Sequence, residues 1–360
     1  MKRTTRTHPD VWRRPRRGAV ALAALAAALA IPPSFASGKG TNDGADPDRA
    51  CSATASTLFT ACGNGVQADD GTARAVCRNL SREPAQARCL ADARAARREG
   101  DRLCRQQLAA RRKACALFGE DPYDPPFDAA SFDEDFTHPT KPNRYFPLRI
   151  GNRWEYRGGA ETTIVEVLNA TKRIAGVTCV VVRDRVLVSG QVVEDTRDWF
   201  AQAKDGTVWY CGEEVKSFET FSGDEPPEPE LVALDGSFKA GRDGAKPGII
   251  FLAAPARDRA YREEFALTSA EDVAEVLSTS YAFGDDPDLD RLVPGPLATA
   301  LCAADCVVTL NYSLLEPGVF ERKYYAPGIG IFLETAPDSG EVVPLVDCNF
   351  DPRCATLPQP

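Results

Sequence analysis

Six cysteines between residues 51 and 115 are spaced in mirror order, and this spacing constrains the fold more than any other feature of the sequence. Successive cysteines are separated by 11, 15, 12, 15 and 11 positions, so pairing them from the outside inward gives residue numbers with a constant sum of 166. Two antiparallel helices of equal rise produce this relation. The spacing therefore predicts a helical hairpin with three disulfides, Cys51–Cys115, Cys62–Cys104 and Cys77–Cys89.

The residues between these cysteines favour two helical arms joined by a turn. Glu83 lies at the midpoint beside Pro84, which suits the first turn of a helix. Residues 85–117 are rich in Ala, Arg, Leu and Gln, so the second arm has high helix propensity. The first arm contains Gly-Asn-Gly at 63–65 and Asp-Asp-Gly at 69–71. We expect these triplets to break it into two shorter helices joined by a loop.

Residues 1–36 have the pattern of a secretory signal peptide. Seven basic residues precede an apolar run from Ala19 to Ile31, and Ala36 offers a cleavage site. Two arginine pairs in the leader fit either an ordinary basic region or a twin-arginine signal. We expect a secreted or periplasmic protein. No later stretch is long and apolar enough for a membrane helix, so none is expected in the mature chain.

Twelve cysteines in an exported chain favour disulfides over metal binding. His138 is the only histidine after the leader, and we expect no metal site and no cofactor. In the second half of the chain, Cys302–Cys306 and Cys348–Cys354 would close local loops, which leaves Cys179–Cys211. Those last two cysteines fall on predicted next-but-one strands, about 9.6 Å apart in a flat sheet. Strong curling or another pairing is needed to join them.

Composition divides the mature chain into a head (residues 37–118), a linker (119–147) and a body (148–360). Residues 37–120 carry fourteen basic and ten acidic side chains, a net charge of +4, whereas residues 121–360 carry 22 and 41, a net charge of −19. Such an acidic body repels phosphate, which argues against nucleic-acid binding. The proline-rich linker contains Phe127, Phe132 and Phe136, which predict that it lies against the body.

Four arginines recur at helical spacing in the second arm: Arg94, Arg98, Arg102 and Arg105. They form either a solvated stripe or a surface that docks on the acidic body or on an acidic partner such as a cell-surface polymer.

From residue 152 onward, segments with two-residue periodicity alternate with glycine-containing turns, which is typical of an antiparallel meander. The predicted strands are 153–157, 161–168, 177–186, 191–200, 207–211, 249–253, 259–267, 306–313, 319–325, 331–335 and 341–346. Thr268 and Glu271 resemble a capping box ahead of a short helix through Leu277. The predicted fold class is α+β, a disulfide-linked helical hairpin followed by a mainly antiparallel β-sheet body. This body is a half-barrel, a barrel or a sandwich.

Three short motifs in the body resemble a class of uncharacterised secreted bacterial proteins. They are Tyr-Phe-Pro-Leu at 145–148, Gly-Asn-Arg-Trp-Glu-Tyr at 151–156 and Tyr-Tyr-Ala-Pro-Gly-Ile-Gly at 324–330. The resemblance covers the body alone. It implies a Gly-Asn-x-Trp-x-Tyr opening strand and a Pro-Gly-x-Gly closing strand pair. Some of these proteins are similar to periplasmic half-barrels that hold lipoproteins or lipids, and the resemblance implies no catalytic residues.

Catalytic motifs are sparse in this sequence. With a single mature histidine, Ser-His-Asp and Cys-His catalysis have little support, and no G-x-S-x-G, H-E-x-x-H or P-loop sequence occurs. Glu194, Asp195 and Asp198 form either a surface cluster or the carboxylates of an extracellular glycan hydrolase. A run of alternating aspartates, Asp286-x-Asp288-x-Asp290, imitates the start of a calcium loop but lacks its later glycine and glutamate.

Aromatic residues on three predicted strands are the candidate ligand-binding residues: Trp154, Tyr156, Trp199, Trp209 and Tyr210. They are either core residues or the lining of an aromatic pocket on a curled sheet. We expect a non-enzymatic secreted or periplasmic protein that binds an apolar small molecule or an envelope protein. The alternatives are a carboxylate-dependent glycan hydrolase and a purely structural envelope component.

Overall fold

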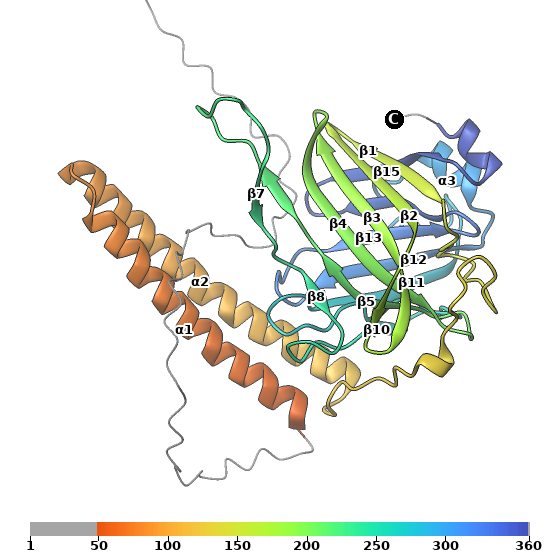
Figure 1. Cartoon of the computed structure of the whole chain (residues 1–360), viewed down its shortest axis with the longest axis horizontal. Helices are drawn as coiled ribbons and strands as arrows, with labels where there is room; N and C mark the ends of the chain where they lie inside the picture. Colours follow the sequence, from red (N-terminus) through yellow and green to blue (C-terminus); the bar gives the residue numbers. More distant parts are fainter. Residues whose placement is uncertain (1–48, 359–360) are drawn as a thin grey trace, which may run out of the picture.

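The computed structural model describes residues 49–358, which form a long helical hairpin followed by one large antiparallel sheet (Figure 1). This arrangement confirms the predicted fold class. None of the helices in the described range combines the length and the hydropathy that a membrane span requires.

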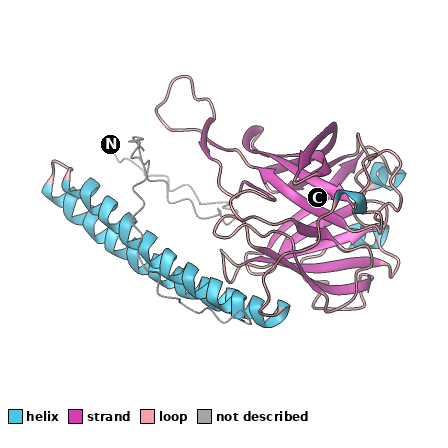
Figure 2. Cartoon of the chain, turned by 60° about the horizontal axis from the view of Figure 1, so that its bottom comes forward, coloured by secondary structure: helices cyan, strands magenta, loops and turns pink. Residues whose placement is uncertain are grey.

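The hairpin consists of α1 (Ala50–Arg78) and α2 (Glu83–Phe118). The three predicted disulfides are confirmed, with Cα–Cα distances of 5.6 Å for Cys51–Cys115, 5.8 Å for Cys62–Cys104 and 5.4 Å for Cys77–Cys89. Their even spacing staples the two helices along their whole length, and the turn lies at the end of the hairpin far from the sheet (Figure 2).

The predicted break in the first arm is wrong, because α1 is continuous through both glycine-containing triplets. Two disulfides flank these triplets and hold the arm against α2. Asp70 is buried and pairs with Arg97 of α2 at 3.1 Å, so tertiary contacts offset the low helix propensity. Val66 of α1 packs against Gly100 of α2. A Cβ added to Gly100 would lie only 2.8 Å from a methyl carbon of Val66, which shows how closely the two helices approach.

The described part of the body contains fifteen strands, a short helix α3 (Gly295–Leu301) and the 3-10 turn η3 (Pro352–Thr356), and the linker contains the 3-10 turn η2 (Ala129–Ser131). The strands are β1 (Arg153–Gly158), β2 (Glu161–Ile174), β3 (Val177–Val188), β4 (Gln191–Gln202), β5 (Val208–Glu214), β6 (Ser217–Glu219), β7 (Glu230–Ala233), β8 (Phe238–Lys239), β9 (Gly248–Phe251), β10 (Ala260–Arg262), β11 (Asp272–Tyr281), β12 (Cys306–Ser313), β13 (Glu321–Ala326), β14 (Gly330–Ala336) and β15 (Glu341–Cys348).

The strands follow one another around the sheet in the order β10-β11-β12-β13-β14-β15-β1-β2-β3-β4-β5-β8. The meander is thus confirmed, and pairing of β15 with β1 joins its late strands to its early ones. Strand β9 pairs with β5. Strand β6 pairs with both β4 and β7, and we call β6 and β7 the β6–β7 arm. The sheet curls so that its two halves enclose one continuous apolar core.

The sheet is curled but not closed. Its two ends meet at one isolated bridge between Lys246 and Phe265 instead of along a ladder. At this point Gly248 of β9 lies against the backbone of Glu263, where a Cβ would overlap the Glu263 carbonyl. Glycine is therefore required for the close approach.

The predicted helix after Thr268 is wrong, since residues 272–281 form β11. The Thr268 backbone N–H does donate to Oε1 of Glu271 at 2.7 Å, as in a capping box. However, Thr268 has a φ of +69°, and the chain turns there into a strand whose buried residues pair with β12. Pairing with a neighbouring strand overrides the local helix signal.

All three body disulfides are confirmed. They include Cys179–Cys211, which would be out of reach in a flat sheet and has a Cα–Cα distance of 6.8 Å here. Cys211 lies in a bulge of the β4–β5 ladder, between the paired residues Tyr210 and Gly212. The β3–β4 ladder ends at Val180, one residue after Cys179. The bulge and the curl bring next-but-one strands within reach.

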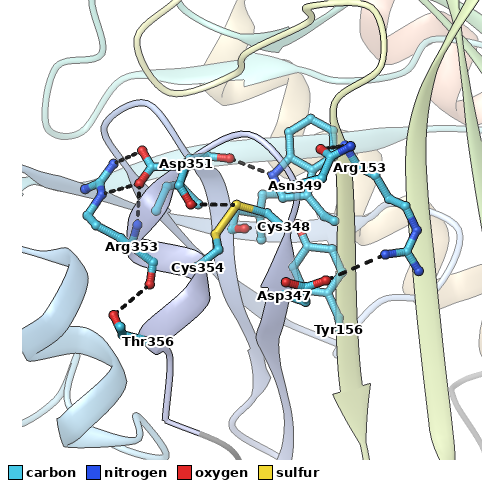
Figure 3. The surroundings of a disulfide bond; sticks show 12 residues. Arg153, Tyr156, Asp347, Cys348, Asn349, Asp351, Arg353, Cys354 and Thr356 are labelled. Carbon is cyan, nitrogen blue, oxygen red and sulfur yellow. Dashed lines mark hydrogen bonds and ion pairs between the residues drawn. A yellow bond between two sulfur atoms is a disulfide. The ribbon is translucent and has the colours of Figure 1, made fainter.

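The disulfide Cys348–Cys354 closes the loop after β15 (Figure 3). In the same loop Asp351 pairs with Arg353 at 2.8 Å, and Oδ1 of Asn349 accepts from the Arg153 backbone N–H at 2.9 Å. The end of β15 is thereby fixed to the start of β1, which carries Trp154 and Tyr156 into the core.

The linker packs on the outer face of the sheet. Phe132 is buried, forms an isolated bridge with Ala203, and lies edge-on to Trp209 with ring centroids 6.1 Å apart. Phe127 contacts the same two rings, and Phe136 reaches the main core. These contacts agree with the expectation from the linker aromatics.

The last turns of α2 dock on the body through buried contacts. The Arg111 guanidinium donates to both carboxylate oxygens of Glu271 at 2.8 and 2.7 Å, and both side chains are almost fully buried. Arg262 lies beside this pair with its guanidinium over the rings of Phe118, Tyr123 and Phe265. Helix, linker and sheet therefore meet at one desolvated cluster.

We predict that Arg111→Met destabilises the protein by about 3–5 kcal/mol, because it leaves the Glu271 carboxylate buried without its charge partner. Arg102→Met is the matched control. Arg102 pairs with Glu99 on the exposed surface of the same helix, so its loss should change the stability far less than the loss of Arg111 does. Urea unfolding measures both. Equal effects of the two substitutions would contradict the proposed docking contact.

Candidate ligand-binding cavity

The curl of the sheet encloses a cavity of about 870 Å³, and residues of β6 and β7 form part of its lining. Part of its wall is apolar and valine-rich, with Val165 and Val167 from β2 and Val182 and Val186 from β3. Phe146 and Leu148, from the end of the linker and the start of the body, extend this wall. The volume lies within the range of small-molecule sites.

The remainder of the cavity wall is strongly acidic. Fourteen carboxyl side chains line it, against one cation, Lys323. They are Glu161, Asp184, Glu194, Asp198, Glu213, Glu219, Asp235, Glu263, Glu264, Asp272, Glu316, Glu321, Glu334 and Glu341. Field lines from like charges concentrate in a concave site with low-dielectric walls. The cavity therefore attracts cations.

A bulge at the end of β10 points two consecutive glutamates inward. The backbone N–H groups of Glu263 and Glu264 both donate to the carbonyl of Asp272, at 2.8 and 3.3 Å. Glu263 and Glu264 thus both lie opposite the single residue Asp272, and successive side chains no longer alternate between the two faces of the sheet. Arg262 lies in the cluster beneath α2, whereas Glu263 and Glu264 line the cavity with each only 5% exposed.

Glu263 is held in place by a short chain of hydrogen bonds. Thr309 donates to Asn311 at 2.6 Å, and Asn311 donates to Oε2 of Glu263 at 2.8 Å. The other oxygen, Oε1, is buried and has no hydrogen-bond partner. Burial raises the pKa of Glu263 to about 7, against the opposing effects of Lys323 and Asn311.

Lys323 provides the positive charge among these carboxyls. It lies directly across the β13–β14 ladder from Glu334. Burial alone would lower its pKa, but the carboxylates of Glu334, Glu263 and Glu321 raise the pKa of Lys323 well above its usual value. The ammonium stays protonated and compensates part of the local negative charge.

A second polar group lies on β4 and β5. The Tyr210 hydroxyl donates a short hydrogen bond to Oδ1 of Asp198. Burial, followed by the charges of Asp198, Glu213 and Glu264, raises the pKa of Tyr210 well above its usual value. The phenol therefore remains a donor at all physiological pH values.

The structure divides the five predicted binding residues between the two faces of the sheet. Trp154, Tyr156 and Tyr210 line the cavity, and Trp154 donates to the Ile329 carbonyl at 2.7 Å. Trp199 and Trp209 belong to the cluster on the outer face, under the linker. Whether any of the five contacts a ligand stays a prediction.

The other sequence candidates are also separated. Glu194 and Asp198 line the cavity, whereas Asp195 forms a bidentate pair with Arg183 and lies outside its lining. Asp286 and Asp290 accept backbone hydrogen bonds that close the turn at 284–290. Within residues 49–358, no group of three His, Cys, Asp or Glu side chains is arranged to hold a metal ion.

The arginine stripe on α2 is exposed in the structure, and Arg102 of this stripe pairs with Glu99 of the same helix. Contact with the body comes instead from Arg111 and from Gln107, which donates to the Leu315 carbonyl at 2.9 Å.

Sequence reasoning missed Glu263, Glu264, Lys323 and Glu334. Their signal in the sequence is the presence of charged residues inside segments predicted as strands, such as Arg-Glu-Glu at 262–264. A charged side chain within a buried strand needs a partner or a function, but the sequence does not tell which face it occupies.

Comparison of the chain with protein-family models, curated proteins and solved structures gave no match. The resemblance drawn from the body motifs therefore stays an expectation.

We predict that Glu263 makes stability fall as the pH rises. Its folded pKa of about 7 exceeds its usual value of 4.5, so its contribution is complete below pH 4.5 and is lost as the pH rises through 7. The free energy of unfolding of the wild type relative to Glu263→Gln should decrease by about 3 kcal/mol between pH 4 and pH 8. Denaturant titrations at several pH values measure this difference. Glu230→Gln, on an exposed strand, is the control, and a pH-independent difference for Glu263→Gln would refute the assignment.

Proposed function

We propose that this chain is an exported binding protein whose cavity takes a ligand with both an apolar portion and a cationic group. The observation that carries the proposal is the composition of the cavity wall, in which fourteen carboxyls and one lysine adjoin a valine-rich surface. The apolar wall suits a hydrocarbon portion, and the carboxyls favour positive charge.

Glu263 supports this assignment most specifically. Its side chain lines the cavity and its buried Oε1 has no hydrogen-bond partner, so a ligand cation that reaches this carboxyl would supply one. A buried polar atom without a partner costs about 1–3 kcal/mol, so a positive charge brought beside this carboxyl offsets part of that cost on binding. The Thr309–Asn311–Glu263 chain fixes the carboxyl before the ligand arrives.

Export rests on the leader sequence and on the cysteines. Residues 1–36 lie outside the described range, and their role as a signal peptide remains a proposal. Six disulfides use all twelve cysteines, and no free cysteine occurs in the described range. This cysteine usage is consistent with an oxidising extracytoplasmic compartment, secreted or periplasmic.

We predict that the protein binds dodecyltrimethylammonium, below its micelle concentration, more tightly than dodecanoate, which has a similar chain and the opposite charge. Isothermal titration calorimetry measures both. Because ionised Glu263 attracts the cation, affinity for dodecyltrimethylammonium should increase about tenfold from pH 6 to pH 8. Equal affinity for the two amphiphiles would contradict the charge preference.

Matched variants separate the cavity from the general charge of the body. Glu263→Gln should remove the pH dependence and weaken binding. Glu166→Gln is the control, since Glu166 lies on β2 outside the cavity lining and changes the net charge equally.

A carboxylate-dependent glycan hydrolase is a second candidate, favoured by one observation. A carboxyl with a pKa of about 7 that faces a cavity is protonated in part near neutral pH, as a general acid requires. Release of reducing sugar from extracellular glycans, lost in Glu263→Gln, would support this alternative over simple binding.

A further inference from the structure

The outer face of strands β2 to β4 carries the charge opposite to that of the cavity. On β3, Val182, Asp184 and Val186 line the cavity, so Arg183 and Arg185 between them project to the other side. On β4 the same alternation turns Arg197 and Trp199 outward, and Arg183 lies directly across the ladder from Arg197. Like charges at such positions repel each other. Asp195 lies among Arg183, Arg185 and Arg197 and compensates part of their charge, which leaves an excess of basic side chains, a basic patch, on the face opposite the acidic cavity.

Within this patch, two lysines converge on one tryptophan. The ammonium nitrogen of Lys172, from β2, lies 4.2 Å from the centroid of the Trp199 ring, and that of Lys239, from β8, lies 4.6 Å from it. The lysines come from elements that are far apart along the strand order. The Trp199 ring is only 2% exposed, so the lysine side chains cover it.

Neither ammonium forms an ion pair with a carboxylate among residues 49–358, although both are only partly exposed. Lys216 shows the ordinary arrangement in the same region, since it pairs with Glu214 at 3.3 Å. Partial burial, followed by the charge of Lys172, lowers the pKa of Lys239, and Arg242 acts in the same direction. The Glu214 carboxylate acts on Lys239 in the opposite direction but more weakly, so the fold brings positive charges together that are only partly compensated.

We propose that Lys172 and Lys239 form a binding site for an oxyanion, a phosphate or sulfate group, on the outer face of the sheet. A doubly charged oxyanion matches two ammonium groups in charge and accepts hydrogen bonds from both. Cation–π contacts hold both ammonium groups against the Trp199 ring. Arg242, in the turn after Lys239, supplies a further positive charge at the edge of the site. This site is independent of the cavity and of the function proposed for it.

The test is a titration of the mature protein with inorganic phosphate, followed by NMR of the lysine side chains. We expect a saturable shift of the Lys172 and Lys239 resonances and a rise in the pKa of Lys239, because a bound anion favours the charged ammonium. Lys172→Met and Lys239→Met retain apolar stems over Trp199 and should each weaken phosphate binding about tenfold. Lys216→Met, which removes a paired lysine nearby, should leave the affinity within about twofold.

A second arm identifies the source of the oxyanion. Vesicles of phosphatidylglycerol present phosphate diesters on a surface, and binding that is tighter than with free phosphate and lost in Lys172→Met would assign a lipid headgroup. Binding of free phosphate with no preference for vesicles would assign a soluble phosphate compound. The proposal is overturned if phosphate causes no saturable shift, or if Lys216→Met weakens binding as much as the other two substitutions do.

Discussion

The body depends on one close backbone approach, the crossing of β9 and β10 at Gly248. A side chain at position 248 would overlap the Glu263 carbonyl, so only glycine allows the two ends of the sheet to meet. The bulge in the adjoining residues then directs Glu263 and Glu264 inward. The same constraint that curls the sheet therefore supplies the most deeply buried carboxyls of the cavity. On the opposite side, Arg262 lies in the aromatic cluster that receives the hairpin.

The curl of the sheet also explains how the cavity tolerates many negatively charged side chains. Each strand contributes only one or a few carboxyls to the cavity, but the curled sheet gathers fourteen of them around a single lysine. Lys323 offsets part of the repulsion, and protonation of Glu263 offsets more. Such an arrangement lowers stability, and proteins retain such costs mainly at functional sites. The disulfides and the buried Arg111–Glu271 pair oppose this cost by fixing the framework around the cavity.

The sequence predicted features that depend on spacing and periodicity, and it failed where distant contacts decide. Mirror spacing identified the hairpin and its three disulfides, and two-residue periodicity identified the antiparallel meander. The continuity of α1 through its glycines was missed because Asp70 and Arg97 belong to different helices. Strand β11 was missed because pairing with β12 overrides a local capping motif. Glu263 and Glu264 both point inward because of a bulge. A bulge changes which face of the sheet the following side chains occupy, and no sequence pattern here indicates it.

We propose that the acidic, curled sheet holds an amphiphile with a positive charge. Native mass spectrometry of the protein purified from its natural source tests this most directly. We expect an additional mass that dissociates at low pH and that, on fragmentation, contains an amine or quaternary ammonium attached to an apolar group. A bound molecule that is anionic, or an uncharged sugar in the cavity, would contradict it.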